Sequence, residues 1–138
     1  MARSGRDIEG QSGAGRVIIP AGVNVWPHEL KTAEALARAG YVVEFIRKSD
    51  VEHEKTADVL IDGELFEMKS PESSSLSVVD KNMKKALSQS CNVVFDSKRM
   101  KYAKDDRVRH ELEKSIAARR KVKSLLFVDK KRVVYELK

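Results

Sequence analysis

The sequence has little cysteine and no long apolar run. Its single cysteine, Cys91, excludes an internal disulfide and leaves the redox compartment open. Cys91 opens an apolar run, which predicts a buried structural thiol. No segment approaches the roughly 18 apolar residues of a membrane-spanning helix. Residues 1–5 lack the apolar core of a secretory signal, so no signal peptide is expected.

Two common functional signatures are also absent. The three histidines, His28, His53 and His110, show no zinc-ligand spacing with Cys91. The glycine-rich start is not followed by the Lys-Ser/Thr pair of a phosphate-binding loop. The sequence therefore gives no sign of a Cys/His zinc site or of a glycine loop that cradles phosphate.

The length and composition fit one globular domain. A chain of 138 residues can bury one core, and a hydrophobic content of 41% with 35% charged residues fits a heavily charged surface. Residues 1–15 hold four glycines and no apolar period, which predicts a flexible N-terminal segment. Residues 16–138 are then expected to form a single domain.

The charge is unevenly distributed along the chain. Residues 1–95 hold 12 Lys/Arg and 14 Asp/Glu, a net charge of −2, whereas residues 96–138 hold 15 and 7, a net charge of +8. An acidic part that could hold metal, followed by a basic part, suits a polyanionic partner such as nucleic acid. Solubility alone would also account for lysine-rich helices.

The apolar periods and turn signals predict an α/β fold with a sheet of mixed strand direction. Pro27 opens the first expected helix and Gly40 ends it. The continuous apolar run in 92–96 predicts a strand that is buried on both faces. The expected strands are 16–20, 41–46, 57–62, 64–69, 92–96, 122–128 and 132–137, and the expected helices are 27–39, 76–89 and 105–120.

Asp62-Gly63 predicts a two-residue β-hairpin turn, because a type I′ turn needs a positive φ at both central positions. In that register Asp58 lies opposite Glu67, and both share one face with Lys69. Two carboxylates placed there repel each other, and a divalent cation held between them would relieve the repulsion. Glu29 lies at the border of the apolar stripe of the first helix. It either joins this site or stands there because the helix dipole favours an acidic residue near the N-terminus.

This arrangement resembles the PD-(D/E)XK nuclease superfamily. The shared elements are Asp58 and Glu67-Met68-Lys69 on a hairpin that follows a Glu-bearing helix and a strand. The expected α-β-β-β-α-β order of residues 28–96 is similar to the restriction-endonuclease-like core, to which residues 97–138 would add a helix and a β-hairpin. Ala57 departs from the superfamily's name, which places proline there, at a position that varies.

More narrowly, residues 28–30, 57–63, 66–71 and 89–96 resemble the C-terminal tRNA-nuclease domains of contact-dependent growth inhibition (CdiA-type) toxins. This resemblance covers roughly residues 17–96. Residues 97–138 match no pattern that we can name.

The resemblance implies a role for each of these residues. Asp58, Glu67 and Glu29 would bind a divalent metal ion, and Lys69 would position the attacking water or stabilise charge on the phosphate. Oxygen ligands favour Mg²⁺ or Mn²⁺. Zn²⁺ is a further option because the neighbouring His28 could supply an imidazole ligand. Gln89 and His28 are further candidates for contacts to the substrate.

The function implied by the resemblance is a metal-dependent endonuclease that hydrolyses phosphodiester bonds of tRNA. It would act as a toxin domain in bacterial competition, in the cytoplasm of a target cell, with an acidic cognate immunity protein as partner. Two alternatives stay open. One is a DNA endonuclease of the resolvase or restriction type with the same site, and the other is a non-catalytic nucleic-acid-binding module in which the acids are remnants.

Overall fold

The computed structural model describes residues 15–47 and 57–138. Of the expected flexible segment 1–15, the structure describes Gly15 alone. His53 lies outside the described residues. The elements, in chain order, are β1 (Arg16–Ile18), α1 (Pro27–Arg38), β2 (Val42–Phe45), β3 (Val59–Ile61), β4 (Glu64–Lys69), α2 (Ser77–Ala86), β5 (Asn92–Asp96), α3 (Asp105–Ala118), β6 (Ser124–Val128) and β7 (Val134–Glu136).

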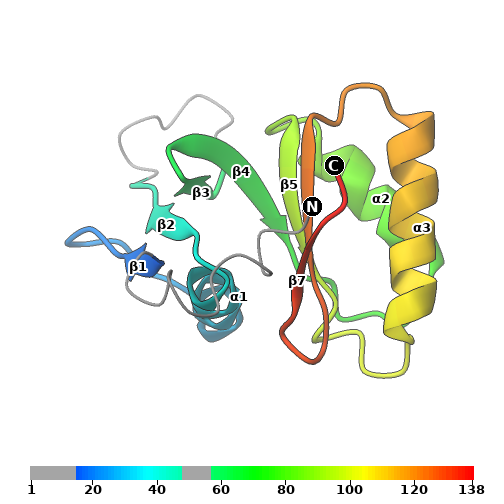
Figure 1. Ribbon diagram of the computed structural model, residues 1–138, viewed down its shortest axis with the longest axis horizontal. Helices are drawn as coiled ribbons and strands as arrows, with labels where there is room; N and C mark the ends of the chain where they lie inside the picture. The colour runs from blue at the N-terminus through cyan, green and yellow to red at the C-terminus, as the bar shows by residue number, and fades with distance from the viewer. Residues whose placement is uncertain (1–14, 48–56) are drawn as a thin grey trace.

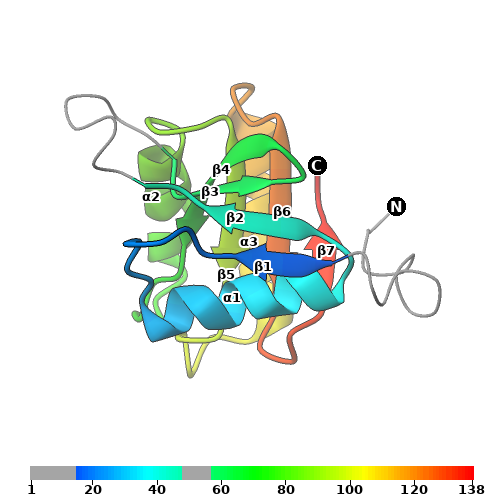
Figure 2. The same ribbon diagram turned by 90° about the vertical axis from the view of Figure 1, so that its left-hand side faces the viewer.

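The strands form one seven-stranded sheet in which each strand pairs with the next one in the sequence. The pairs β1–β2, β4–β5 and β5–β6 are parallel, and the other three pairs are antiparallel. The predicted α/β class with a sheet of mixed direction is therefore confirmed. The sheet is strongly curled: in Figure 2, β1–β4 run across the view, while β5–β7 run nearly upright behind them.

The curl creates two apolar layers. Helix α1 lies on the concave side, where one core cluster joins its Leu36 to Val43 and Phe66 of the first strands and to Val94 and Leu126 beyond the bend. Helices α2 and α3 cover the outer face of β5–β7 (Figure 1), where a second cluster forms. Strand β5 is buried at every residue, as predicted. In the part of the chain that the structure describes, no helix has the length and apolar content needed to span a membrane.

Helix α1 begins and ends as the sequence predicts. Pro27 occupies the first helical position, where its missing N–H costs nothing. Gly40 has a φ of 98°, which permits the backbone to leave the helix. There the Gly40 N–H donates to the carbonyl of Ala37 and the Tyr41 N–H donates to that of Leu36, as in a Schellman motif.

The β3–β4 hairpin has the predicted turn and register. Asp62 and Gly63 have φ values of 49° and 87°, and Ile61 pairs with Glu64. The Asp62 side chain also accepts a hydrogen bond of 2.9 Å from the backbone N–H of Val42, which ties the turn to β2. The hairpin that bears the expected site is therefore held by its own strand pairing and by its contact with β2.

A buried ion pair lies where α1 approaches the end of β5. Arg132 donates two hydrogen bonds to Asp96, of 2.9 and 2.7 Å, and the side chains are 19% and 3% exposed. The hydroxyl of Thr32 on α1 lies 2.5 Å from the same carboxylate, and the Lys98 N–H donates to it at 2.8 Å. The carboxylate thus links α1, the end of β5 and the β6–β7 turn.

Three expectations need correction. Helix α2 ends at Ala86 rather than at Gln89, and the backbone then forms turns in which Gln89 N–H donates to Ala86. The last two strands are shorter than expected, Ser124–Val128 and Val134–Glu136. Strand β6 begins later because the Val122 N–H donates to Arg119 in the turn after α3, and β7 begins later because the Arg132 N–H donates to Asp129 in a wider connecting turn. Cys91 is only half-buried, since it precedes β5 rather than lying within it.

Replacing Arg132 by alanine is expected to lower the free energy of unfolding by about 3 kcal/mol, because it leaves a buried carboxylate without its cation. Urea denaturation measures this change. Lys114→Ala removes an exposed ion pair to Glu111 on α3 and serves as the matched control, with an expected loss below about 1 kcal/mol. Equal losses in the two variants would contradict the role assigned to the Asp96–Arg132 pair.

A second prediction concerns Asp80, which joins α2 to α3. Two hydrogen bonds from Arg119 and one from Ser115 lower the pKa of Asp80 from 3.8 to about 2. Because the folded pKa lies below the unfolded value, this stabilisation is present above pH 3.8 and is lost as the pH falls toward 2. Carboxyl NMR should show the Asp80 midpoint returning toward 3.8 in Arg119→Ala. An unchanged midpoint would rule out this account.

Candidate active site

The paired register of β3 and β4 ends at Val59 opposite Phe66. Just before it, the Asp58 N–H donates to the carbonyl of Phe66 at 3.1 Å, and the Met68 N–H donates to Asp58 Oδ2 at 3.1 Å. Asp58 is thus bonded to the two residues that flank Glu67, and its N–H bond lies one residue out of the expected register, as in a β-bulge. The expected pairing of the two carboxylates stays a prediction.

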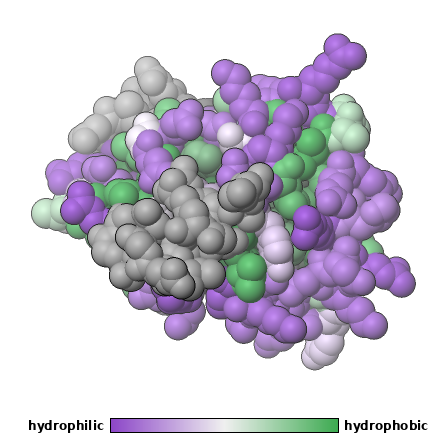
Figure 3. Space-filling view, in the orientation of Figure 1, coloured by the Kyte–Doolittle hydropathy of each residue, from purple (hydrophilic) through white to green (hydrophobic). Residues whose placement is uncertain are grey.

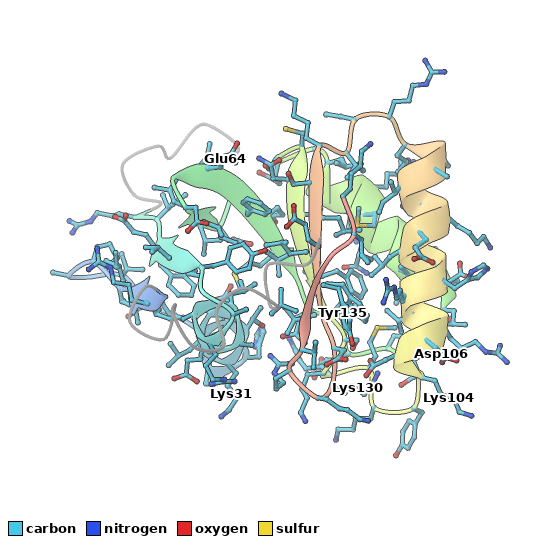
Figure 4. The ribbon with its side chains drawn as sticks, in the orientation of Figure 1. Lys31, Glu64, Lys104, Asp106, Lys130 and Tyr135 are labelled. Carbon is cyan, nitrogen blue, oxygen red and sulfur yellow. The ribbon has the colours of Figure 1, made fainter. Side chains whose placement is uncertain are left out.

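Glu67 is a buried carboxylate, 7% exposed, in the middle of β4. Its neighbours in β5 show which face it occupies: Glu67 pairs with Val93 and Lys69 with Phe95, and both apolar partners belong to the cluster beneath α2 and α3. Lys69 Nζ lies 3.6 Å from Glu67 Oε2. The acid and the lysine thus form a pair at the C-terminal end of β4, whereas Glu64 lies at the other end of the strand (Figure 4).

Glu29 and Asp58 meet in a cleft of about 320 Å³ at the start of α1. The other lining residues come from the turn before α1 and from the end of β2: Gly22, Val23, Asn24, Trp26, Phe45, Ile46 and Arg47. Glu29 Oε1 accepts a hydrogen bond of 3.0 Å from the Trp26 N–H, so Glu29 also caps its own helix. The capping contact agrees with a role of Glu29 at the helix N-terminus. Its place in the cleft agrees with the hypothesis that it belongs to the site.

The expected metal ligands do not form a compact group. Within residues 15–47 and 57–138, no three His, Cys, Asp or Glu side chains lie close enough together to hold a metal ion. Asp58, Glu67 and Glu29 offer the carboxylate oxygens that a hard cation prefers. Asp58 and Glu29 line the cleft, whereas Glu67 lies beside Val93 of the cluster beneath α2 and α3. The metal site stays a prediction.

The two further candidates lie apart from this group. The His28 ring stacks against Trp26, with centroids 6.5 Å apart and an interplanar angle of 22°. Gln89 lies in the turn before β5, where the neighbouring Ser90 hydroxyl donates to the carbonyl of Leu65 at the start of β4. Gln89 is therefore near the opposite end of β4 from Lys69, and its contact with the substrate also stays a prediction.

At the C-terminal ends of β5 and β6, the acidic side chains are hydrogen-bonded to other residues of the protein. Burial alone would raise the pKa of Asp105, but hydrogen bonds from the Ser97 hydroxyl (2.6 Å) and the Lys130 N–H (3.0 Å) outweigh it and lower the pKa below its usual value. Figure 4 shows Lys130 at this edge, close to where α3 begins. Ligands often bind at such strand ends, but here Asp96 and Asp105 support the fold.

A basic hollow lies at the C-terminal ends of α2 and α3. It is lined by Lys84, Arg119, Arg120 and Lys121, together with Leu87, Ser88 and Ala118. The molecular face in Figure 3 is predominantly hydrophilic, with small apolar areas between charged side chains. Part of the positive charge noted in the sequence is therefore concentrated on the side of the sheet that α2 and α3 cover.

Three residues of the cleft were missed by the sequence analysis: Asn24, Trp26 and Arg47. Arg47 Nη2 donates to the carbonyl of Ala21 at 2.6 Å, so the end of β2 holds the turn that precedes α1. The available signal was the position of Trp26, a large aromatic residue directly before a helix-opening proline. Its exposure depends on the tertiary structure and could not be read from local pattern.

Comparisons with known proteins agree with this architecture. Residues 55–134, more than half of the chain, match the contact-dependent growth inhibition CdiA C-terminal domain family. The fold is similar to a chain of the CdiA-CT/CdiI toxin and immunity complex from Burkholderia pseudomallei, with a TM-score of 0.64 over 88% of this chain and 98% of that chain. The two sequences are 16% identical, so this likeness concerns the fold. No curated protein sequence matches the chain.

Proposed function

This chain belongs to the contact-dependent growth inhibition CdiA C-terminal domain family, whose members are toxin domains in bacterial competition, and we propose that it is a metal-dependent endonuclease that cleaves tRNA. The proposal is supported by the two hydrogen bonds that join Asp58 to Phe66 and Met68, the neighbours of Glu67 on the β3–β4 hairpin. Lys69 Nζ lies 3.6 Å from the Glu67 carboxylate.

The arrangement of elements supports a PD-(D/E)XK type of nuclease. The run α1-β2-β3-β4-α2-β5 has the helix, three-stranded meander, helix and strand of a restriction-endonuclease-like core. Glu67 and Lys69 lie on the third strand of that meander, Asp58 directly precedes the second, and Glu29 lies on the preceding helix. This order of residue types supports the proposal.

The chemistry of the site suits phosphodiester hydrolysis. A divalent cation held by Asp58 and Glu67, with Glu29 near the same cleft, would supply Lewis acidity and a water of lowered pKa. Lys69 places a positive charge beside the Glu67 carboxylate, where it can stabilise the negative charge that develops on the phosphoryl oxygens. Burial of Glu67 strengthens these electrostatic effects because it lowers the local dielectric constant.

The distribution of charge supports a polyanionic substrate and an acidic partner. Residues 96–138 carry a net charge of +8, and part of it gathers in the basic hollow at the ends of α2 and α3. Nucleic acid backbones bind to such surfaces. A cognate immunity protein with acidic residues would bind there as well, in keeping with the toxin and immunity complex of the structural neighbour.

Glu67→Gln is expected to reduce tRNA cleavage by at least about 100-fold, because loss of a metal-binding carboxylate removes several kcal/mol of transition-state stabilisation. The measurement is gel analysis of total tRNA and plasmid DNA with Mg²⁺, Mn²⁺, Zn²⁺ or EDTA. Glu64→Gln makes the same chemical change on the same strand, at its exposed end, and should cleave like the unmodified protein.

Each outcome of this assay separates the proposal from its alternatives. Cleavage of tRNA alone, dependent on metal and on Glu67, supports the proposed function. Cleavage of plasmid DNA instead would keep the site and assign the chain to the DNA endonucleases. Salt-sensitive binding of nucleic acid without turnover under any metal would leave a binding module.

Metal binding can be tested apart from activity. Isothermal titration with Mn²⁺ should show one site in the unmodified protein and in Glu64→Gln, with affinity reduced by about 10-fold or more in Asp58→Asn and in Glu67→Gln. The asparagine keeps an oxygen that can accept the Met68 N–H, so the hairpin is retained. Unchanged affinity in both variants would remove Asp58 and Glu67 from the metal site.

A further inference from the structure

Trp26 exposes an apolar surface that folding does not require. It is the single tryptophan of the chain and 68% of it is exposed, although it directly precedes a helix whose apolar face is well buried. Leaving so large a side chain in water forgoes the stabilisation of burial. Exposed aromatic residues beside a polar cleft are typical of surfaces that bind a planar ligand.

The position of Trp26 is fixed by its neighbours. Its backbone N–H donates to Glu29 Oε1 at 3.0 Å, and its backbone carbonyl accepts from the Leu30 N–H at 3.0 Å. These bonds hold the backbone, and the indole stacks against the ring of His28 with centroids 6.5 Å apart. Holding the residue in place before a ligand arrives lowers the entropy lost on binding.

The cleft beside Trp26 offers the groups that recognise a nucleotide. Trp26 supplies a flat aromatic face, Asn24 an amide, and Arg47 a cation, while Glu29 and Asp58 provide the acidic side. Arg47 is held by its hydrogen bond to the Ala21 carbonyl, which uses only one of its five donors. Guanidinium groups bind phosphate through such donors.

From this arrangement we infer that Trp26 stacks on an unpaired base of the RNA substrate next to the scissile phosphate, and that Arg47 contacts a neighbouring backbone phosphate. The inference rests on the proposed function and adds the substrate class. A base within a duplex is already stacked on both sides, so only a base in a loop or at an unpaired end can lie on the indole. The cut is thus directed to single-stranded segments of the RNA.

The test uses the fluorescence of Trp26, which no other tryptophan obscures. In a Glu67→Gln background, which prevents turnover, a short unpaired oligoribonucleotide should quench this fluorescence with saturation, and the same sequence in a blunt duplex should not. Trp26→Ala should weaken binding of the labelled unpaired oligonucleotide by about 10-fold, and Trp26→Phe should recover most of that loss. With Glu67 intact, Trp26→Ala should raise KM for tRNA and change kcat far less.

Tyr102→Ala is the matched control. Tyr102 is 89% exposed but borders a different hollow, with Ser74 and Lys104, so its loss should leave RNA binding unchanged. If the unmodified protein cuts RNA while Trp26→Ala keeps its KM and its affinity, the stacking role is wrong and the proposed function stands. If no RNA is cut or bound by the unmodified protein, both fall. A loss in Trp26→Ala that Trp26→Phe does not recover, with a lowered melting temperature, would assign Trp26 a structural role and overturn the inference.

Discussion

Strand β4 hydrogen-bonds to an antiparallel neighbour on one side and to a parallel neighbour on the other, and the rest of the molecule depends on this double pairing. Toward β3 it belongs to the first half of the sheet, which encloses α1. Toward β5 it belongs to the second half, which α2 and α3 cover. Side chains alternate between the two faces along a strand, so Phe66 enters the inner core and Glu67 faces the helices. The acid is buried because helices cover that face of the second half of the sheet.

Two acids from distant segments line the same cleft. Asp58 lies just before β3 and borders the cleft at the start of α1. Glu29 reaches that cleft because α1 packs on the concave side of the sheet. Structural carboxylates are treated differently: Asp96, Asp105 and Asp80 each accept several hydrogen bonds from cations and hydroxyls. At the candidate site, the described ion pair joins Lys69 to Glu67.

Local chemistry predicted much of the fold. Asp62-Gly63 determined the turn and the register from Val59–Phe66 to Ile61–Glu64. The grouping of Asp58 with Glu67 and Lys69 stays a prediction, of which the structure describes the contact between Lys69 and Glu67. The apolar run 92–96 predicted the fully buried β5. The curl could not be predicted, because it arises from packing of α1 between strands that are far apart in the sequence. The residues that line the cleft could not be predicted for a related reason. Trp26 and Arg47 lie in irregular segments, which a hydrogen bond from Arg47 to the Ala21 carbonyl brings together.

The order of strands in the sheet has a consequence for how the chain can fold. Each strand pairs with its immediate predecessor, so a chain that emerges from its N-terminus can add strands one at a time, with short loop closures. The contacts between α1 and β6 and the bonds from Arg132 to Asp96 form only when the last residues are present. A partly emerged chain could thus hold a nearly complete acidic hairpin while its inner core is still open. Closure by β6 and β7 would then be the step that converts a string of local pairings into a cooperative domain.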